Sequence, residues 1–163
     1  MSTQQHIQDS REDENESFKL FLRGSDPEEI DQLVYAIQEK VTAMTDCTVC
    51  GNCCRSLMIN VEQEELEPLG IRLRLPVTEI KNRFIEESSQ GQLIINTIPC
   101  HFLNNSKCTI YEDRFTECRE FPHLHKKGFL KRLFGIFMHY DRCPIICNTI
   151  EKLKTETAFY YEK

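Results

Sequence analysis

The pattern of apolar and polar positions separates a polar N-terminal segment from a longer part with regular periodicity. Residues 1–16 are polar and acidic and have no apolar period, which is typical of a loosely attached tail. Ser25 or Asp26, followed by Pro27, is a typical helix start. Apolar side chains then recur at helical spacing, at Ile30, Leu33, Val34, Ile37, Val41 and Met44. We therefore predict a helix over residues 26–44, directly before a run of cysteines.

Beyond the cysteine run, the predicted elements are short. Strands are predicted over residues 57–61, 92–97 and 108–111, and helices over residues 62–69, 112–121 and 144–160, with one more helix beginning at Thr78. Pro68 is expected to end its helix, and residues 104–106 to form a hairpin turn. Residues 128–140 are so apolar that they should be buried, as either a helix or a strand. The expected fold class is α+β: a small, irregular cysteine-cluster domain with short strands and several helices organised around metal.

Charge is concentrated at the N-terminus. Residues 1–31 contain nine acidic and three basic side chains, so they carry the whole net charge of −6 and the remainder is neutral. We expect an acidic, flexible segment over residues 1–24, able to dock a protein partner, and a single cysteine-cluster metal-binding domain over residues 25–163. A neutral body without a basic stripe argues against nucleic acid as a partner. A membrane partner is not expected either, because no run of eighteen apolar residues is present.

Nine cysteines are the most informative feature of the composition. Four fall within eight residues, at Cys47, Cys50, Cys53 and Cys54, and the others are Cys100, Cys108, Cys118, Cys143 and Cys147. Nothing resembles an export signal, so we expect a cytoplasmic protein and favour metal ligation over disulfides or inert buried thiols. Thiolates two residues apart can converge on one metal, and Gly51 and Asn52 tolerate the left-handed backbone of such a turn. Iron–sulfur loops use the same spacing, so the metal stays open.

The spacing also suggests which cysteines bind the same metal. The natural ligand trio is Cys47, Cys50 and Cys53. Successive residues point in different directions, so Cys53 and Cys54 are expected to serve different ligand sets. Alternatively, one of them contacts the ligands without binding the metal itself. With Cys147 set aside as a packed thiol, eight cysteines can form two four-thiolate sites, or one cluster and one mononuclear site. His101 is a weaker candidate ligand. Four cations adjoin a cysteine and could offset thiolate charge: Arg55, Lys107, Arg119 and Arg142.

Motifs surround these cysteines in five segments. They are Cys47 to Cys54, Pro99-Cys100-His-Phe102-Leu103, Cys108-Thr-Ile110-Tyr111, Arg114-Phe-Thr-Glu-Cys118-Arg119-Glu-Phe121-Pro122 and Cys143-Pro144. Over about residues 47–150 they resemble the YkgJ-type cysteine-cluster family, a CxxCxxCC domain linked to zinc or iron chelation. Phe115 stands where that family has proline, a departure that loosens a turn but removes no ligand.

The resemblance implies a ligand set and a function. The implied metal ligands are Cys47, Cys50, Cys53, Cys54, Cys100, Cys108, Cys118 and Cys143. The implied cofactor is zinc or iron, or an iron–sulfur cluster, held by a metal-binding protein whose cellular role the family leaves unassigned. Flagellin lysine-N-methylases are similar over the same region but much longer, so the alternative function is an iron-dependent protein-modifying enzyme. The chain has no glycine-rich nucleotide loop, which places metal binding ahead of that alternative.

Overall fold

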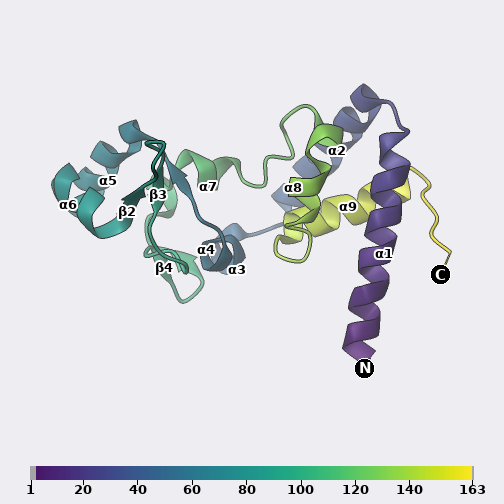
Figure 1. Ribbon diagram of the computed structural model, residues 1–163, viewed down its shortest axis with the longest axis horizontal. Helices are drawn as coiled ribbons and strands as arrows, with labels where there is room; N and C mark the ends of the chain where they lie inside the picture. The colour runs from purple at the N-terminus through teal and green to yellow at the C-terminus, as the bar shows by residue number, and fades with distance from the viewer. Residues whose placement is uncertain (1–2, 163) are drawn as a thin grey trace. The chain divides into compact units, whose positions relative to one another are not determined.

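The chain forms two compact units. The computed structural model describes residues 3–162, with side chains from residue 11 onwards. We call residues 46–121 the cysteine unit, and the two flanking segments, up to residue 45 and from residue 122, the helical unit. Figure 1 shows the elements of both. Helices, short strands and single turns alternate, which confirms the predicted α+β class.

The helical unit is built from helices that precede and follow the cysteine unit in the chain. Its elements are α1 (Thr3–Arg23), α2 (Pro27–Ala43), η3 (Phe129–Arg132), α8 (Leu133–Phe137) and α9 (Pro144–Glu156). The predicted helix over residues 26–44 is confirmed as α2. Asp26 caps it, because its carboxylate accepts hydrogen bonds from the amides of Glu28 and Glu29 at 3.0 and 2.9 Å. Proline at the first turn costs no hydrogen bond there.

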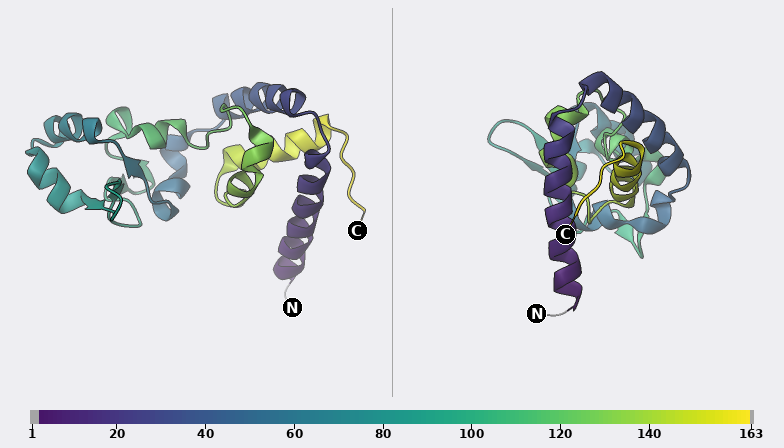
Figure 2. Two further views of the ribbon diagram at one scale, coloured as in Figure 1. Left: turned by 45° about the horizontal axis from the view of Figure 1, so that its top comes forward. Right: turned by 90° about the vertical axis from the view of Figure 1, so that its right-hand side faces the viewer.

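The core of the helical unit lies between α2 and α9, which run side by side (Figures 1 and 2). The apolar stripe of α2 buries Ile30, Val34, Ile37 and Val41, and α9 buries Ile146, Ile150 and Leu153. Asp31 fastens η3 to α2, since its carboxylate accepts from the amides of Gly128 and Phe129 at 2.7 and 2.8 Å.

The N-terminal segment is helical as far as it is described. In α1, Phe18 and Leu22 are fully buried, and the Phe18 ring lies 4.8 Å from the Phe159 ring. Glu14 accepts a hydrogen bond from the buried Lys154 at 3.0 Å. The sequence predicts a flexible segment over residues 1–24 and one domain over residues 25–163. The structure has α1 within the first range and divides the chain into two compact units. Flexibility of the segment and folding of the rest as a single domain stay predictions.

The cysteine unit consists of short elements. In chain order they are α3 (Cys47–Cys50), α4 (Asn52–Ser56), β1 (Asn60–Val61), η1 (Gln63–Glu65), α5 (Leu66–Leu73), α6 (Val77–Phe84), β2 (Ile85–Glu87), β3 (Leu93–Ile95), β4 (Leu103–Asn104), β5 (Lys107–Cys108), η2 (Tyr111–Asp113) and α7 (Thr116–Glu120). An antiparallel sheet has the order β1-β3-β2, with Val61 opposite Leu93 and Ile85 opposite Ile95. A separate hairpin pairs β4 with β5 and sets Leu103 opposite Cys108. Asn105 and Ser106 make its turn with positive φ, as the predicted hairpin requires.

One apolar cluster holds these elements together. Its buried members are Ile59, Val61, Leu66, Leu69, Ile80, Leu93, Ile95, Phe102, Ile110 and Phe115. Three cysteines, Cys100, Cys108 and Cys118, pack against the cluster while remaining partly exposed. The core therefore supports a layer of thiols.

Some sequence predictions do not match the structure. Pro68 does not end its helix, because it falls in the first turn of α5, where a missing amide costs nothing. The helix predicted over residues 112–121 is interrupted at Arg114 and Phe115, whose backbone is extended. Residues 128–140 are helical, but Phe134 is 80% exposed rather than buried. In the part of the chain that the structure describes, no helix combines the length and the apolar composition needed to cross a membrane.

Candidate metal centre

The cysteine run folds as two short helical turns joined at Gly51. Asp46 caps the first, because its carboxylate accepts from the Thr48 amide at 2.8 Å. Gly51 then adopts φ of 63°, and a Cβ at this position would lie 2.9 Å from the Ser106 carbonyl oxygen. Only glycine fits a left-handed position so close to another backbone. Asn52, also expected to tolerate a left-handed turn, is instead the first residue of α4.

Arg55 ties this loop to the β4–β5 hairpin. Its Nη1 atom donates to the Cys50 carbonyl oxygen at 2.9 Å, and its Nη2 atom donates to the Ser106 hydroxyl. Because Ser106 belongs to the turn that leads into β5, this bridge holds the cysteine run beside the strand that carries Cys108. The sequence suggested Arg55 as a countercharge, whereas the structure shows it fastening backbone segments.

The remaining cysteines of the unit reach the same region from three other segments. The Cys100 amide donates to the Cys54 carbonyl oxygen at 2.8 Å. Cys118 lies on α7, whose first amide, that of Thr116, donates to Glu65 Oε1 at 2.6 Å. Phe115, the residue found in place of the family proline, is 3% exposed and belongs to the apolar cluster. It therefore anchors the start of α7 by burial, where proline would restrict the backbone.

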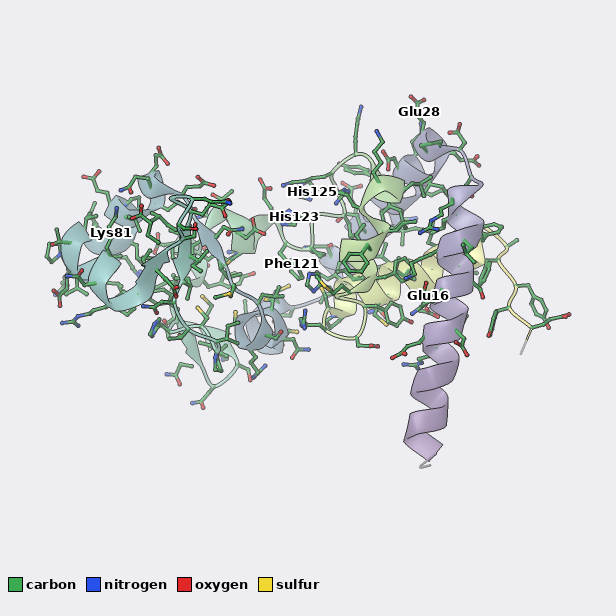
Figure 3. All side chains as sticks on the ribbon, in the orientation of Figure 1. Glu16, Glu28, Lys81, Phe121, His123 and His125 are labelled. Atoms are coloured by element: carbon green, nitrogen blue, oxygen red, sulfur yellow. The ribbon has the colours of Figure 1, made fainter. Side chains whose placement is uncertain are left out.

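The thiols of Cys53 and Cys54 point to the same side. Their Sγ atoms are in hydrogen-bond contact at 4.0 Å, so the expectation that successive cysteines point apart is wrong here, because both lie on the tight α4 turn. Two thiolates bound to one tetrahedral zinc ion are about 3.8 Å apart, given a Zn–S bond of about 2.3 Å. The sulfur atoms of the unit, drawn in yellow, gather beside α3 and α4 in Figure 3.

Burial and mutual proximity shift the acidities of these thiols. Burial raises the pKa of Cys118 to about 12 and also raises the pKa values of Cys47, Cys100 and Cys108. The hydrogen bond from Cys54 lowers the pKa of Cys53 to about 6, and the same contact raises the pKa of Cys54. A thiolate at Cys53 is thus stabilised by its neighbour, while the thiols whose pKa values are raised keep their protons until a cation replaces the proton.

Arg114 supplies positive charge to the thiols. Its guanidinium lies 4.0 Å from the centre of the Tyr111 ring and donates to the Tyr111 carbonyl oxygen at 2.7 Å. From there it acts to lower the pKa values of Cys47, Cys108 and Cys118. Arg114 is not among the cations that adjoin a cysteine in the sequence, because it is four residues from the nearest one. The sequence feature that points to Arg114 is its place as the first residue of the Arg114-to-Pro122 motif, which contains Cys118.

The donor set fits a thiophilic cation, although the side chains are not gathered to ligating distance. Seven thiols come from four segments of one unit, and zinc and iron favour sulfur ligands. His101 is occupied elsewhere, with its Nε2 atom 2.7 Å from Asn96 Oδ1. Among the described residues, no group of three potential ligands is arranged to enclose an ion. The sulfurs would have to draw together on binding, as expected where ligation and folding are coupled.

The last two cysteines belong to the helical unit. Cys143 is 8% exposed and is the N-cap residue of α9, and Cys147 follows one turn later. Cys147 is a hydrogen-bond partner of the Tyr140 hydroxyl, which donates to Glu151 Oε1 at 2.6 Å. Burial, and then the Glu151 hydrogen bond, raise the pKa of Tyr140. Of the eight predicted ligands, the structure therefore brings seven into one unit and assigns Cys143 to the other.

A comparison with family models identifies the relatives of this region. Residues 46–135, more than half of the chain, match the CxxCxxCC model, described as a "Putative zinc- or iron-chelating domain". The chain belongs to the CxxCxxCC family. The match contains all seven cysteines of the cysteine unit and ends before Cys143. No curated protein and no solved structure matches the chain.

Proposed function

We propose that this member of the CxxCxxCC family binds zinc or iron through the thiolates of its cysteine unit, and that binding completes the fold of that unit. The observation that carries the proposal is the presence of seven thiols in one compact unit, three of which (Cys100, Cys108 and Cys118) pack against its apolar core. All seven thiols are offered as ligands. They are Cys47, Cys50, Cys53, Cys54, Cys100, Cys108 and Cys118. The family match supports metal chelation in general, and the all-sulfur donor set narrows the choice to thiophilic ions.

The size of the unit gives a physical reason for a metal. Residues 46–121 form a unit of about 76 residues, close to the size below which an apolar core alone supplies only about 3–5 kcal/mol. Its helices have at most eight residues and its strands at most three. Elements this short are not stable alone. A structural metal adds its binding free energy to folding and offsets that weakness.

The centre suits a reducing compartment. All nine cysteines lie among the described residues and none of them forms a disulfide, and thiolate ligands compete with disulfides only where thiols stay reduced. We therefore include a cytoplasmic location in the proposal. The acidic N-terminal segment stays a predicted arm for a protein partner. The methyl-transfer alternative rests on the sequence resemblance, and the structure adds no observation in its favour.

Anaerobic purification followed by native mass determination tests the proposal. We expect zinc or iron bound to the full-length chain, with inorganic sulfide and a brown colour if the centre is an iron–sulfur cluster. Cys118→Ser should lower the metal content, and Cys147→Ser, the matched change in the helical unit, should leave it unchanged. A folded wild-type protein that contains and takes up neither metal would overturn the proposal. Equal loss in both variants would show that the ligand assignment is wrong.

A further inference from the structure

One surface of the helical unit combines exposed apolar side chains with positive charge. Phe134 is 80% exposed and Met138 is 58% exposed. They follow Lys131 at spacings of three and four residues, so the three side chains share one side of η3 and α8. The Lys131 side chain turns back over the loop that carries the exposed Lys127, because its Cδ atom lies 3.9 Å from where a Cβ at Gly128 would be. We call Lys127, Lys131, Phe134 and Met138 the basic patch.

The outward side of α1 carries the opposite charge. The inward side of this helix buries Phe18 and Leu22. On the outward side, residues at spacings of three and four are exposed, and three of the four are acidic. We call them the acidic face: Glu12, Asp13, Glu16 and Leu20. Leu20 is 65% exposed, and the N-terminal half of α1 extends past α8 and α9 in Figures 1 and 2, which leaves the acidic face open to a partner.

The two surfaces match in charge and in the order of their side chains. Along both, the charged side chains come first and the apolar ones follow. Two such segments side by side in the same direction pair carboxylates with ammonium groups, and Leu20 with Phe134 or Met138. The match cannot be made within one chain. There α1 meets α8 on its inward side, where the Phe18 and Phe137 rings lie 6.5 Å apart, so the acidic face points away from its own basic patch.

We infer that the chain forms a two-fold dimer in which the acidic face of each copy docks on the basic patch of the other. A two-fold axis makes this contact twice, so both surfaces of both copies are covered. Charge complementarity argues for a second copy as the occupant, because the same chain supplies both halves of the match. The dimer gives the acidic arm of the proposed function its partner, and in that respect it rests on that function. The contact itself lies in the helical unit and needs no metal.

Sedimentation velocity of the full-length protein, over a range of concentrations and at low and high salt, tests the dimer. The wild type should dimerise at low salt and dissociate as salt screens the charges. Charge reversal in Lys127→Glu/Lys131→Glu, or in Glu12→Lys/Asp13→Lys, should weaken the dimer by more than about tenfold, because like charges then face each other. An equimolar mixture of the two double variants should form a one-to-one heterodimer, because both of its contacts again pair opposite charges.

Single substitutions test the apolar part and supply the controls. Phe134→Ser should weaken the dimer by about tenfold, because an aromatic side chain no longer leaves water on association. Tyr35→Ser removes a 50% exposed ring from α2 and should leave the dimer unchanged. Lys40→Glu, at an exposed position of the same helix, is the matched change of charge and should also have no effect.

The outcomes decide the inference separately from the proposed function. It is overturned by a chain that is monomeric at every concentration, which would leave the basic patch to a different occupant. A dimer that the charge reversals do not weaken, a mixture that forms no heterodimer, or equal weakening in the controls has the same consequence. Metal analysis of the same samples keeps the two proposals apart. A monomer that contains zinc or iron overturns the dimer alone, and a dimer that contains and takes up neither metal overturns metal binding alone.

Discussion

The helical unit and the cysteine unit use different means to hold together. Among the residues whose side chains are described, the helical unit contains sixteen buried hydrophobic residues and the cysteine unit ten. The helical unit places eight of its sixteen on α2 and α9, helices of 17 and 13 residues, whereas no helix of the cysteine unit is longer than eight residues and no strand longer than three. Burial of apolar area stabilises the first directly. The second pairs a smaller core with a group of thiols, and in the proposed function a bound metal adds the stability that its smaller core lacks.

Removal of metal should produce the largest difference in stability between the two units. Chelation from the full-length protein should cost the cysteine unit several kcal/mol, because ligation and folding are coupled there. Hydrogen exchange measured residue by residue should show protection lost across residues 46–121 and retained in α2 and α9. Protection that is lost equally in both units, or in neither, would contradict the comparison.

Truncation of a core side chain should weaken metal binding in the cysteine unit but not in the helical unit. Leu153→Ala, at a fully buried position of α9, should lower the free energy of unfolding by about 2–5 kcal/mol and leave the metal content unchanged. Leu69→Ala, at 1% exposure in the cysteine unit, should weaken metal affinity as well. Denaturant unfolding with metal analysis measures both. Reduced metal binding in Leu153→Ala would show that the two units are energetically linked.

Two glycine-to-alanine substitutions, one in each unit, test the geometry of the cysteine run. Gly51→Ala should destabilise the cysteine unit by about 1–3 kcal/mol, because alanine is strained at positive φ and its Cβ would approach the Ser106 carbonyl oxygen to 2.9 Å. Gly135→Ala in α8 meets no atom within 4 Å and should be neutral or slightly stabilising. Thermal unfolding of the two variants gives the comparison. Similar melting temperatures would mean that the Gly51 turn is not required.

The smallest expected effect is on how the stability of the helical unit depends on pH. Burial acts to raise the pKa of Glu151, but hydrogen bonds from Lys154 and Tyr140 outweigh it and hold the pKa below the ordinary 4.5. A lowered carboxyl pKa contributes stability above the ordinary pKa, and that stability is lost as the pH falls through the lower, folded-state value. Glu151→Gln should therefore destabilise the unit by about 0.5 kcal/mol at neutral pH, as for other half-exposed pairs.

Urea unfolding at pH 7 and again in acid checks this pH dependence. The difference between Glu151→Gln and the wild type should disappear in acid, where the wild-type carboxylate is also neutral. Glu39→Gln, at an exposed position of α2, provides the matched substitution and should show no such difference. A Glu151→Gln effect that persists in acid would assign it to packing rather than to charge.

The elements that could be predicted from the sequence are those with enough length to show a period. The cap at Asp26 and the stripe from Ile30 to Val41 predict α2 within a residue at each end. Predictions failed where local rules and packing compete, as at Pro68, which fits inside the first turn of α5. In α8, Phe134 shows that an apolar residue is not always a buried one.

The chemistry of the centre was also visible in the chain, because sulfur ligands and their spacing are properties of the residues themselves. The CxxCxxCC run, its motifs and the preference for zinc or iron need no coordinates. Which thiols share a unit, the contact between Cys53 and Cys54, the contribution of Arg114 and the location of Cys143 in the other unit depended on the tertiary structure. The hydrogen bond from the Cys100 amide to the Cys54 carbonyl oxygen, for example, joins residues 46 apart in the chain. Packing of the apolar core, and not the spacing of the cysteines, decides such contacts.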